Sequence, residues 1–205
     1  MKTILIFFIT LSLSVFAADN SIHIEQIGDN NQFSITHSGS FNTITGINQQ
    51  RALINGSSNQ INIMQIDNNV LKLSITGNNN NMSVDQNSGN LLENTISGNG
   101  NLLNFTQLNS PNKSINSSIT GSNNSIIANQ QGTGQHSLGL ILTGNGHNVN
   151  SNQKDSGNHS AIINLTNSGG PSIVNLTQQG STSQNYSLIQ SCGIAAGCIN
   201  TINQQ

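Results

Sequence analysis

Short runs of alternating apolar and polar residues recur along most of the chain. The clearest example joins two such runs at one glycine, in Ile75-Thr76-Gly77-Asn78-Asn79-Asn80-Asn81-Met82-Ser83-Val84-Asp85-Gln86. Alternation with a period of two is typical of a half-buried β-strand. Gly and Asn suit the turn between the runs because both tolerate a positive φ. Each unit is therefore predicted to contain a strand, a turn, a second strand and then a Gly/Asn/Ser-rich loop.

Aligning the units on the turn glycine shows an internal repeat. The predicted turn glycines are Gly28, Gly56, Gly77, Gly98, Gly121, Gly144 and Gly169, and Gly193 continues the series. The intervals are 28, 21, 21, 23, 23, 25 and 24 residues. A period in the low twenties is typical of repeat proteins in which no unit buries its apolar face alone. Extra residues around Thr45 to Arg51 predict a bulge in the second unit, and unit seven carries an extra residue between Leu165 and Gly170.

The second strand of each unit repeats the same residue types on one face. The third residue after the glycine is Asn31, Asn59, Asn80, Asn101 or Asn124, followed by His147 and Ser172. The fifth is Phe33, Ile61, Met82, Leu103, Ile126, Val149 or Val174. The ninth is Gln65, Gln86, Gln107, Gln130, Gln153 or Gln178, with His37 in the first unit. Buried amides are costly unless hydrogen-bonded, and identical amides stacked at the strand spacing can bond one another. We therefore predict an all-β fold, a β-solenoid of about eight strand-turn-strand coils with amyloid-like (cross-β) stacking, in which these Asn and Gln residues form ladders.

Both ends of the chain depart from the repeat. Residues 1–18 look like a secretory signal peptide, with Lys2, an apolar run and a cleavage site after Ala17 or Ala18. Residues 19–205 form the repeat domain, whose last unit, 183–205, is degenerate. Cys192 and Cys198 could close a small loop by a disulfide in an oxidising compartment; two small buried residues or an incomplete metal site are the alternatives. No capping helix is predicted, so strand edges are expected to be exposed at the ends.

The composition is polar and nearly uncharged. Charged residues make up 6 % and aromatic residues 3 % of the chain, and the net charge is −2. This lies close to the low-complexity classes that favour β-aggregation. Disorder is the competing interpretation, but the regularly placed Ile, Leu and Val residues oppose it. Clustered Lys and Arg are absent, so no nucleic-acid partner is expected.

The sequence does not indicate an enzyme. The acids Asp29, Asp67, Asp85, Glu93 and Asp155 are scattered, with no pair placed for acid/base catalysis. The histidines His23, His37, His136, His147 and His159 show no metal-ligand spacing within a unit. His136 and His159 begin adjacent units and are expected to be neighbours, in a ladder or at the surface, with weak metal binding as the alternative. We predict no catalytic residue, no metal and no cofactor.

The few charges stand near turns or strand ends rather than in the apolar columns. They are Arg51, Asp67, Lys72, Asp85, Lys113, Lys154 and Asp155. Charges in such places tune solubility and slow premature stacking. Lys113 and Lys154 are the two predicted to delay assembly most directly.

The spacing Gly-x2-Asn-x-apolar-x3-Gln resembles the curlin repeat, the unit of bacterial curli fibres, whose pattern is S-x5-Q-x-G-x2-N-x-A-x3-Q. The first unit reads Gln26-Ile27-Gly28, followed by Asn31, Phe33 and His37; the fourth has Gly98, Asn101, Leu103 and Gln107, and the fifth Gly121, Asn124, Ile126 and Gln130. The resemblance covers residues 20–205. The first-strand Gln is mostly Ile or Leu, the leading Ser is usually absent, and larger apolar residues replace the Ala.

The resemblance implies a secreted structural subunit of curli-like extracellular amyloid fibres at the bacterial cell surface, for adhesion and biofilm matrix. It implies as partners the chain itself or a related fibre subunit, an outer-membrane secretion pore and accessory chaperones. The bulk subunit and the minor nucleator both fit. The open strand edges favour assembly by templated strand addition. The alternative is a monomeric β-solenoid adhesin or surface-binding protein whose end is blocked by the cysteine-closed last unit.

Overall fold

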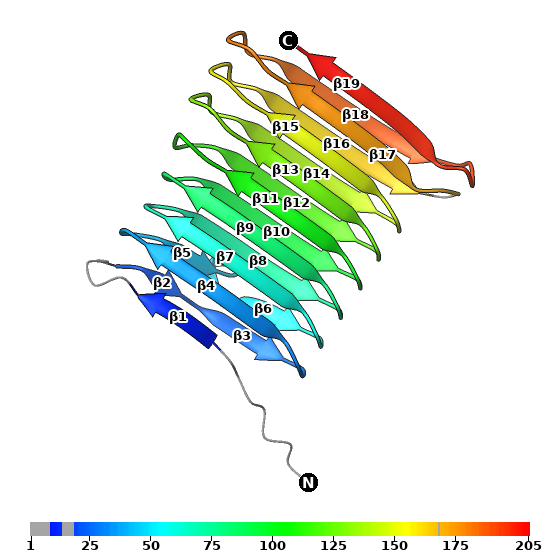
Figure 1. Cartoon of the computed structure of the whole chain (residues 1–205). Helices are drawn as coiled ribbons and strands as arrows, with labels where there is room; N and C mark the ends of the chain where they lie inside the picture. The colour runs from blue at the N-terminus through cyan, green and yellow to red at the C-terminus, as the bar shows by residue number, and fades with distance from the viewer. Residues whose placement is uncertain (1–8, 14–18, 168) are drawn as a thin grey trace.

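Two parallel β-sheets face each other along the molecule in the computed structural model, which describes residues 9–13, 19–167 and 169–205 (Figure 1). Sheet A contains β1 (Ile9–Leu13), β4 (Gln32–Ser38), β7 (Gln60–Ile66), β9 (Asn81–Asn87), β11 (Leu102–Gln107), β13 (Ser125–Gln130), β15 (Asn148–Gln153), β17 (Ser172–Gln178) and β19 (Cys198–Gln204). Sheet B contains β2 (Ser21–Ile22), β3 (Ile24–Ile27), β5 (Thr43–Thr45), β6 (Ala52–Asn55), β8 (Val70–Thr76), β10 (Leu91–Ser97), β12 (Ser114–Thr120), β14 (Ser137–Thr143), β16 (Ser160–Asn167) and β18 (Asn185–Cys192).

Successive coils stack in register. Gln65 pairs with Gln86, which pairs with Gln107, and every other strand pair of the regular coils is likewise parallel. Consecutive strands of the chain lie in opposite sheets, so each strand pairs with its counterpart one coil away. This arrangement confirms the predicted all-β solenoid of about eight coils.

The irregular coils lie toward the ends. In the second coil the sheet-B strand is divided into β5 and β6 by a loop that contains the short 3₁₀ turn η1 (Ile47–Gln49), which confirms the bulge predicted from the long repeat interval. Of the predicted signal peptide, residues 1–8 and 14–18 lie outside the described residues. Residues 9–13 form β1, which pairs with β4 at the edge of sheet A.

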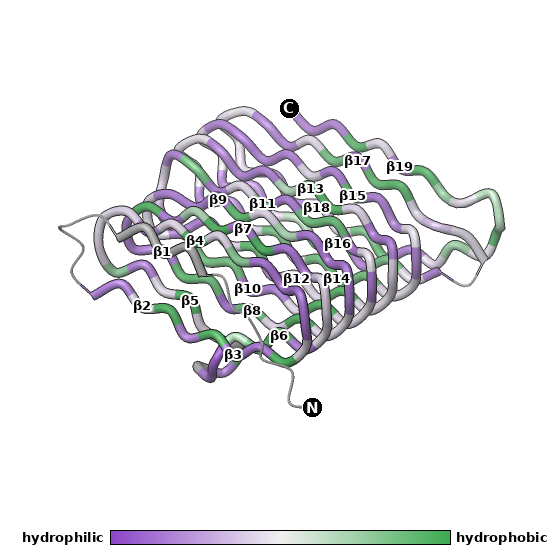
Figure 2. The backbone as a smooth tube through the Cα atoms, turned by 60° about the horizontal axis from the view of Figure 1, so that its bottom comes forward, coloured by the Kyte–Doolittle hydropathy of each residue, from purple (hydrophilic) through white to green (hydrophobic). Residues whose placement is uncertain are grey.

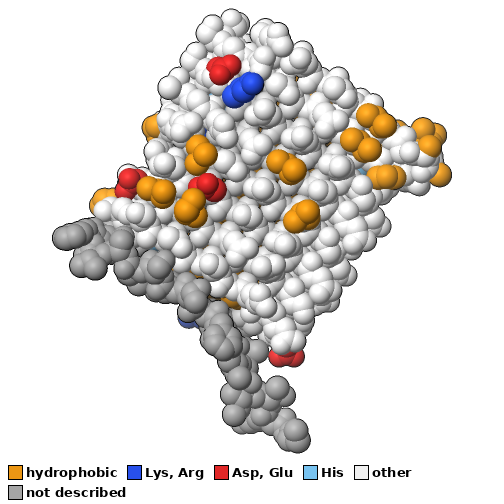
Figure 3. Space-filling view, viewed as in Figure 1, with side chains coloured by type: hydrophobic (Ala, Val, Ile, Leu, Met, Phe, Trp, Pro, Cys, Tyr) orange, Lys and Arg blue, Asp and Glu red, His pale blue; other side chains and the backbone are white. Residues whose placement is uncertain are grey.

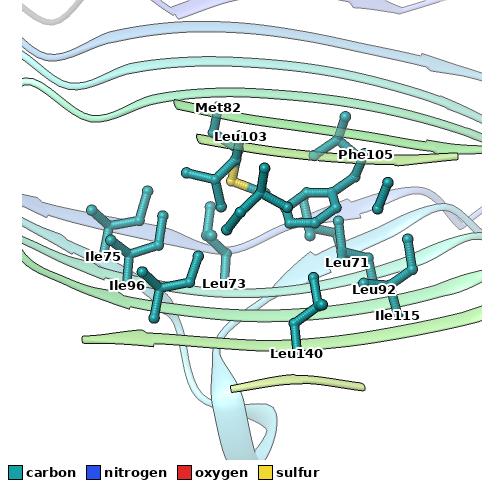
Figure 4. Packing of buried hydrophobic residues seen from close by; sticks show 14 of the residues in the cluster. Leu71, Leu73, Ile75, Met82, Leu92, Ile96, Leu103, Phe105, Ile115 and Leu140 are labelled. Carbon is teal, nitrogen blue, oxygen red and sulfur yellow. The ribbon is translucent and has the colours of Figure 1, made fainter. Parts of the chain in front are cut away.

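The core is a thin apolar layer between the sheets. Burial alternates along each strand, and the hydropathy of the chain alternates with it (Figure 2). Figure 4 shows Met82, Leu103 and Phe105 of sheet A pointing toward Leu71 and Leu92 of sheet B. Phe105 is fully buried and is one of the largest side chains in the layer. Stacked Ile, Leu, Val and Phe columns therefore supply the hydrophobic stabilisation that one coil could not provide alone.

Three polar side chains interrupt these apolar columns. Asn94, Ser117 and Ser151 are buried, and Asn94 Oδ1 and the two serine Oγ atoms have no hydrogen-bond partner among the described residues. An unsatisfied buried polar group destabilises a fold by about 1–3 kcal/mol. Ser151 pairs in register with Ala128, so alanine already fits this column.

We predict that Ser151→Ala raises the free energy of unfolding by about 1 kcal/mol, because it removes an unpaired hydroxyl and opens only a small space. Urea unfolding followed by circular dichroism measures the change. Asn124→Ala is the matched control, since it removes a buried polar group that is fully hydrogen-bonded, and it should lower stability by about 2 kcal/mol. A loss of stability in Ser151→Ala would contradict the prediction.

Candidate functional site: polar columns and coil ends

A column of glutamine amides runs along sheet A beside the apolar layer. From Gln65 to Gln178, each Nε2 donates to Oε1 of the glutamine in the next coil at 2.8–3.0 Å, and the series ends on Gln204. The same Nε2 atoms also donate to sheet-B carbonyls, as from Gln153 to Ser137 O at 2.9 Å. The six predicted glutamines are thus brought together. Their column joins the two sheets, and every glutamine-to-glutamine bond in it donates toward the C-terminal end.

A column of asparagines lies at the opposite end of the sheet-A strands. Its members are the predicted Asn31, Asn59, Asn80, Asn101 and Asn124. Each Oδ1 accepts from the backbone N–H and the side-chain Nδ2 of the next member at 2.9–3.0 Å. Each Nδ2 also donates to the carbonyl of the turn glycine in the next coil at 2.8–3.1 Å. The column therefore connects the start of each sheet-A strand to the glycine turn of the next coil.

His147 replaces asparagine in this column. Its backbone N–H donates to Asn124 Oδ1 at 2.8 Å, and its Nδ1 accepts from the backbone N–H of Ser172 at 3.1 Å. Its Nε2 donates to Thr143 O at 3.2 Å. Burial lowers the pKa of His147, opposed by the hydrogen bond to Thr143. A neutral imidazole offers one donor and one acceptor, which is what the column needs from an amide.

Six of the seven predicted turn glycines stack on one another. Gly28, Gly56, Gly77, Gly98, Gly121 and Gly144 have φ between 114° and 147°. A Cβ on Gly77 would lie 2.0 Å from the carbonyl oxygen of Gly98. Glycine is required because only it combines a positive φ with so close an approach of two backbones.

Gly169 lies in the turn between β16 and β17, but it does not stack on Gly144. Thr143 pairs with Thr166, so Asn167 follows Gly144 in the column, and a Cβ on Gly144 would meet the Asn167 side chain. Gly169 instead lies against Gly193 in the last coil. Because Val149 pairs with Val174, the extra residues of unit seven lie in the turn that contains Gly169.

A third polar column was not recognised in the sequence. It consists of the residue before each sheet-B strand, namely Asn20, Asn42, Asn69, Asn90, Lys113, His136, His159 and Gln184. In its first half Oδ1 of each asparagine accepts the backbone N–H of the next member, as from Asn90 to Asn69 at 3.0 Å and from Lys113 to Asn90 at 2.9 Å. In its second half, the same position in successive coils is occupied by Lys113, His136, His159 and Gln184 instead of asparagine.

Loop length explains the change. Asn69 and Asn90 follow their ladder glutamines by four residues, whereas Lys113, His136, His159 and Gln184 follow theirs by six. Each side chain reaches back to a carbonyl of its own loop: Asn69 to Ile66 O at 2.7 Å, His136 to Gln131 O at 2.7 Å, His159 to Lys154 O at 2.9 Å and Gln184 to Gln179 O at 3.0 Å. A longer loop encloses more space, so a longer side chain is needed to satisfy its carbonyls.

Lys113 is buried rather than placed at the surface, which corrects the interpretation of it as a solubilising charge. Its side chain is fully buried, and Nζ donates to Ser110 O at 3.1 Å and Gly132 O at 2.9 Å. Burial lowers the pKa of Lys113 to about 8. Lys72 forms an ion pair with Glu93 of the neighbouring strand at 3.2 Å.

His136 and His159 are neighbours, as their positions in the repeat predicted. Their rings are stacked, with centroids 5.1 Å apart and an interplanar angle of 1°. Each Nε2 donates to a loop carbonyl, and each Nδ1 is buried without a partner. Burial is the main reason that the pKa of His136 falls to about 4. The hydrogen bond to the Gln131 carbonyl and the negative charge of Asp155 raise the pKa, whereas the positive charges of His159 and Lys113 lower it further. In the described part of the chain, no three His, Cys, Asp or Glu side chains are grouped so that they could hold a metal ion.

The last coil carries the cysteine pair. Cys192 and Cys198 form a disulfide, with Cα atoms 5.8 Å apart, between the end of β18 and the start of β19. The inward side chains Tyr186, Leu188 and Ile202 are only partly buried, because they pack against the preceding coil on one side. No described residue covers the outer edges of β18 and β19.

No protein-family model, curated protein or solved structure matches this chain. The resemblance to the curlin repeat therefore stays a prediction from the sequence. Among the described residues, no helix has the length and apolar character needed to cross a membrane.

We predict that acid destabilises the fold through the buried histidines. His136 is neutral when folded and has a pKa near 6.5 when unfolded, so stability is complete above pH 6.5 and is lost as the pH falls toward its folded pKa of about 4. This single shift corresponds to a loss of about 3 kcal/mol. Urea midpoints at neutral and acid pH measure it.

The double variant His136→Gln/His159→Gln should remove most of this loss, because Gln184 already makes the equivalent bond to its loop. His23→Gln is the control, since the His23 side chain is exposed and should leave the acid response unchanged. If the double variant loses as much stability at acid pH as the unsubstituted chain, these histidines are not the cause of the acid sensitivity.

Proposed function

We propose that this chain is a secreted structural subunit that polymerises end to end into curli-like extracellular fibres. The observation that carries the proposal is the open last coil, in which every column of the solenoid ends without a cap. Tyr186, Leu188 and Ile202 present the ends of three apolar columns, and Gln204 presents the end of the glutamine ladder. Another coil of the same pattern would bury these groups and continue each ladder.

The backbone of β19 offers free donors for this addition. The N–H of Cys198 donates to Pro171 O, and Gln204 O accepts from the N–H of Gln179, so these residues bond inward to the β17 side. In a parallel strand the N–H and C=O of one residue point to the same side and alternate along the chain. Ile199, Thr201 and Asn203 therefore direct their N–H groups to the open edge.

Low charge supports repeated stacking. The face shown in Figure 3 carries few charged side chains, and the one basic group near its top lies beside an acidic one. If each subunit placed a charged side chain at the same position, these like charges would repel one another along a fibre, whereas stacked amides form hydrogen bonds with one another. The curlin resemblance adds the proposed export, the cell-surface location and the role in adhesion and biofilm matrix.

The alternative, a monomeric adhesin, depended on a blocked end. The disulfide joins β18 to β19 across their own loop, residues 193–197, and lies beside the strands rather than over their open edges. The cysteine pair thus stabilises the last coil without covering it, and the polymer is the better-supported function.

We predict that Thr201→Pro abolishes growth while the fold is retained. Proline removes an N–H at the open edge, where edge strands tolerate it, and leaves the bonds to β17 intact. Thr201→Val is the matched control, because it keeps the N–H and should polymerise at the rate of the unsubstituted chain. Thioflavin-T fluorescence with and without preformed seeds measures growth, and fibre diffraction should show reflections near 4.7 and 10 Å.

Two results would contradict the proposal. Seeded growth of Thr201→Pro at the unsubstituted rate would show that β19 is not the growing edge. A chain that stays monomeric when oxidised and polymerises only after reduction of the disulfide would instead support the adhesin with a blocked end.

A further inference from the structure

The first two coils hold buried side-chain polar atoms that have no hydrogen-bond partner among the described residues. Gln26 Oε1, both ring nitrogens of His37 and Gln65 Oε1 are buried and make no hydrogen bond within the described residues. The Gln26 amide group does bond locally through Nε2, which donates to Gly28 O at 3.1 Å. Gln26 and His37 are the first members of two columns, and Gln65 is the second member of the column that His37 begins.

The C-terminal coil holds the complementary donors. Gln204 Oε1 accepts from Gln178, while its Nε2 has only a long contact of 3.4 Å to Asn185 O. Gln190 Oε1 accepts from Asn200 Nδ2, and within the described residues its own Nε2 donates to no group. In these two columns one end of the molecule thus presents N–H groups where the other presents acceptors.

The columns that carry these groups match from end to end. One column of sheet B begins with Gln26 next to Ile54 and ends with Gln190 next to Leu165, so both of its terminal members are glutamines. The ladder of sheet A begins with His37 next to Gln65 and ends with Gln204. Between them, Ile35 begins the apolar column of sheet A that ends on Ile202.

We propose that a second copy of this chain binds with its β19 along β4 and its β18 along β2 and β3, in the register that places Gln204 of one copy beside His37 of the next and Gln190 beside Gln26. Gln190 Nε2 then donates to Gln26 Oε1, and Gln204 Nε2 donates to a ring nitrogen of His37. This inference rests on the proposed polymerisation and specifies its junction. It also makes growth head to tail, because donors meet acceptors only in that orientation.

His37 is the polar joint of this junction. Its neutral ring has one N–H, which the Gln65 Oε1 acceptor requires, and one acceptor nitrogen, which Gln204 Nε2 requires. Protonation turns the acceptor into a second donor facing an N–H group and buries a charge. In the full chain, where β1 pairs with β4, burial lowers the pKa of His37, opposed by the Gln65 side chain. A second copy in the place of β1 is expected to favour the neutral ring in the same way.

No carboxylate stands ready to compensate that charge. Strands β1, β4, β7, β18 and β19 contain no Asp, Glu, Lys or Arg. The nearest titratable groups on the N-terminal coil, His23 and Glu25, have exposed side chains. Asp67, near the loop that follows β4, is also exposed and accepts from the backbone N–H of Ser40.

In the full chain β1 occupies the position that the second copy would take. Leu13 of β1 pairs with His37, where Gln204 of the second copy would lie. Because β1 pairs only with β4, residues 19–205 keep every other strand pair and the whole set of columns. The predicted signal cleavage after Ala17 or Ala18 would free this edge, and residues 19–205 are therefore the chain to test beside the full one.

Register is tested by mixing two variants of residues 19–205 that each carry one added cysteine beside the Cys192–Cys198 disulfide. Ser34 and Thr201 are both exposed, and the proposed junction makes them direct neighbours on adjacent strands, about 4.8 Å apart and within disulfide reach. Fibres grown from Ser34→Cys and Thr201→Cys chains should give covalent dimers on mild oxidation. Ser34→Cys mixed with Asn203→Cys is the matched control, since that pair is shifted by two residues to about 7–8 Å and should not link.

The joint is tested by the pH dependence of seeded growth. Growth of residues 19–205 should fall roughly tenfold for each pH unit below the pKa of His37 at the open end. His37→Gln restores a glutamine to the ladder and should grow equally fast from about pH 7.5 to about pH 5. Circular dichroism of the monomers at each pH separates this effect from acid unfolding, and the full chain should add subunits more slowly than residues 19–205.

The outcomes separate the junction from the function. Fibres that link the shifted pair, or that link neither pair, overturn the register while the fibre function stands. Equal pH dependence in His37→Gln and in the unsubstituted chain overturns the joint. Absence of seeded growth in every variant overturns the proposed function and the junction with it.

Discussion

The buried amide column is the constraint on which the rest of the structure depends. An amide inside a dry interface is stable only if both its N–H and its C=O are bonded, and in this molecule the partner is the same residue one coil away. A slip of one residue would turn every Gln outward and every neighbouring polar group inward. The apolar columns alone would tolerate small shifts and exchanges of Ile for Leu or Val. The amide columns do not, so they fix the register that the apolar columns then fill.

This constraint explains where the chain is free to vary. Loops differ in length from coil to coil, yet each strand returns to its place because the flanking ladder residues must meet. Where the loop is long, Lys113, His136 or His159 fills the enclosed space and bonds its carbonyls; where it is short, asparagine is sufficient. Variation in the loops is therefore coupled to the identity of one side chain. The cost is a set of buried titratable groups that a column of asparagines would not contain.

The regular columns could be predicted from the sequence because their members repeat in identity as well as in position. Asn80, Asn101 and Gln107 are found by counting from a glycine, and the period of two then places them on one strand face. The third column, which precedes the sheet-B strands, could not be found in this way because its residue type changes with loop length and does not repeat along the whole column. The burial of Lys113 could not be predicted for a related reason. A charged side chain usually lies at the surface, and only the carbonyl groups enclosed by the loop compensate for burying this one. Counting from glycines also misses Asn167, which follows Gly144 in the column because unit seven has a longer turn.

Direction is the property that polar columns add to a stacked fold. An apolar column is the same when read from either end, whereas the glutamine ladder donates only toward the C-terminal coil. Reversing one amide would set two donors against each other on one side and two acceptors on the other. The orientation of the whole ladder is therefore decided within a single folded chain. The two ends of the glutamine ladder are consequently different, one offering N–H groups and the other acceptors. The asparagine column runs the opposite way, since each Nδ2 donates to the preceding member. Each of these columns therefore has two unlike ends, and each end of the molecule is complementary to the opposite end of an identical chain rather than to itself. A solenoid of this kind favours open head-to-tail growth over closed pairs, because two like ends cannot satisfy each other's hydrogen bonds.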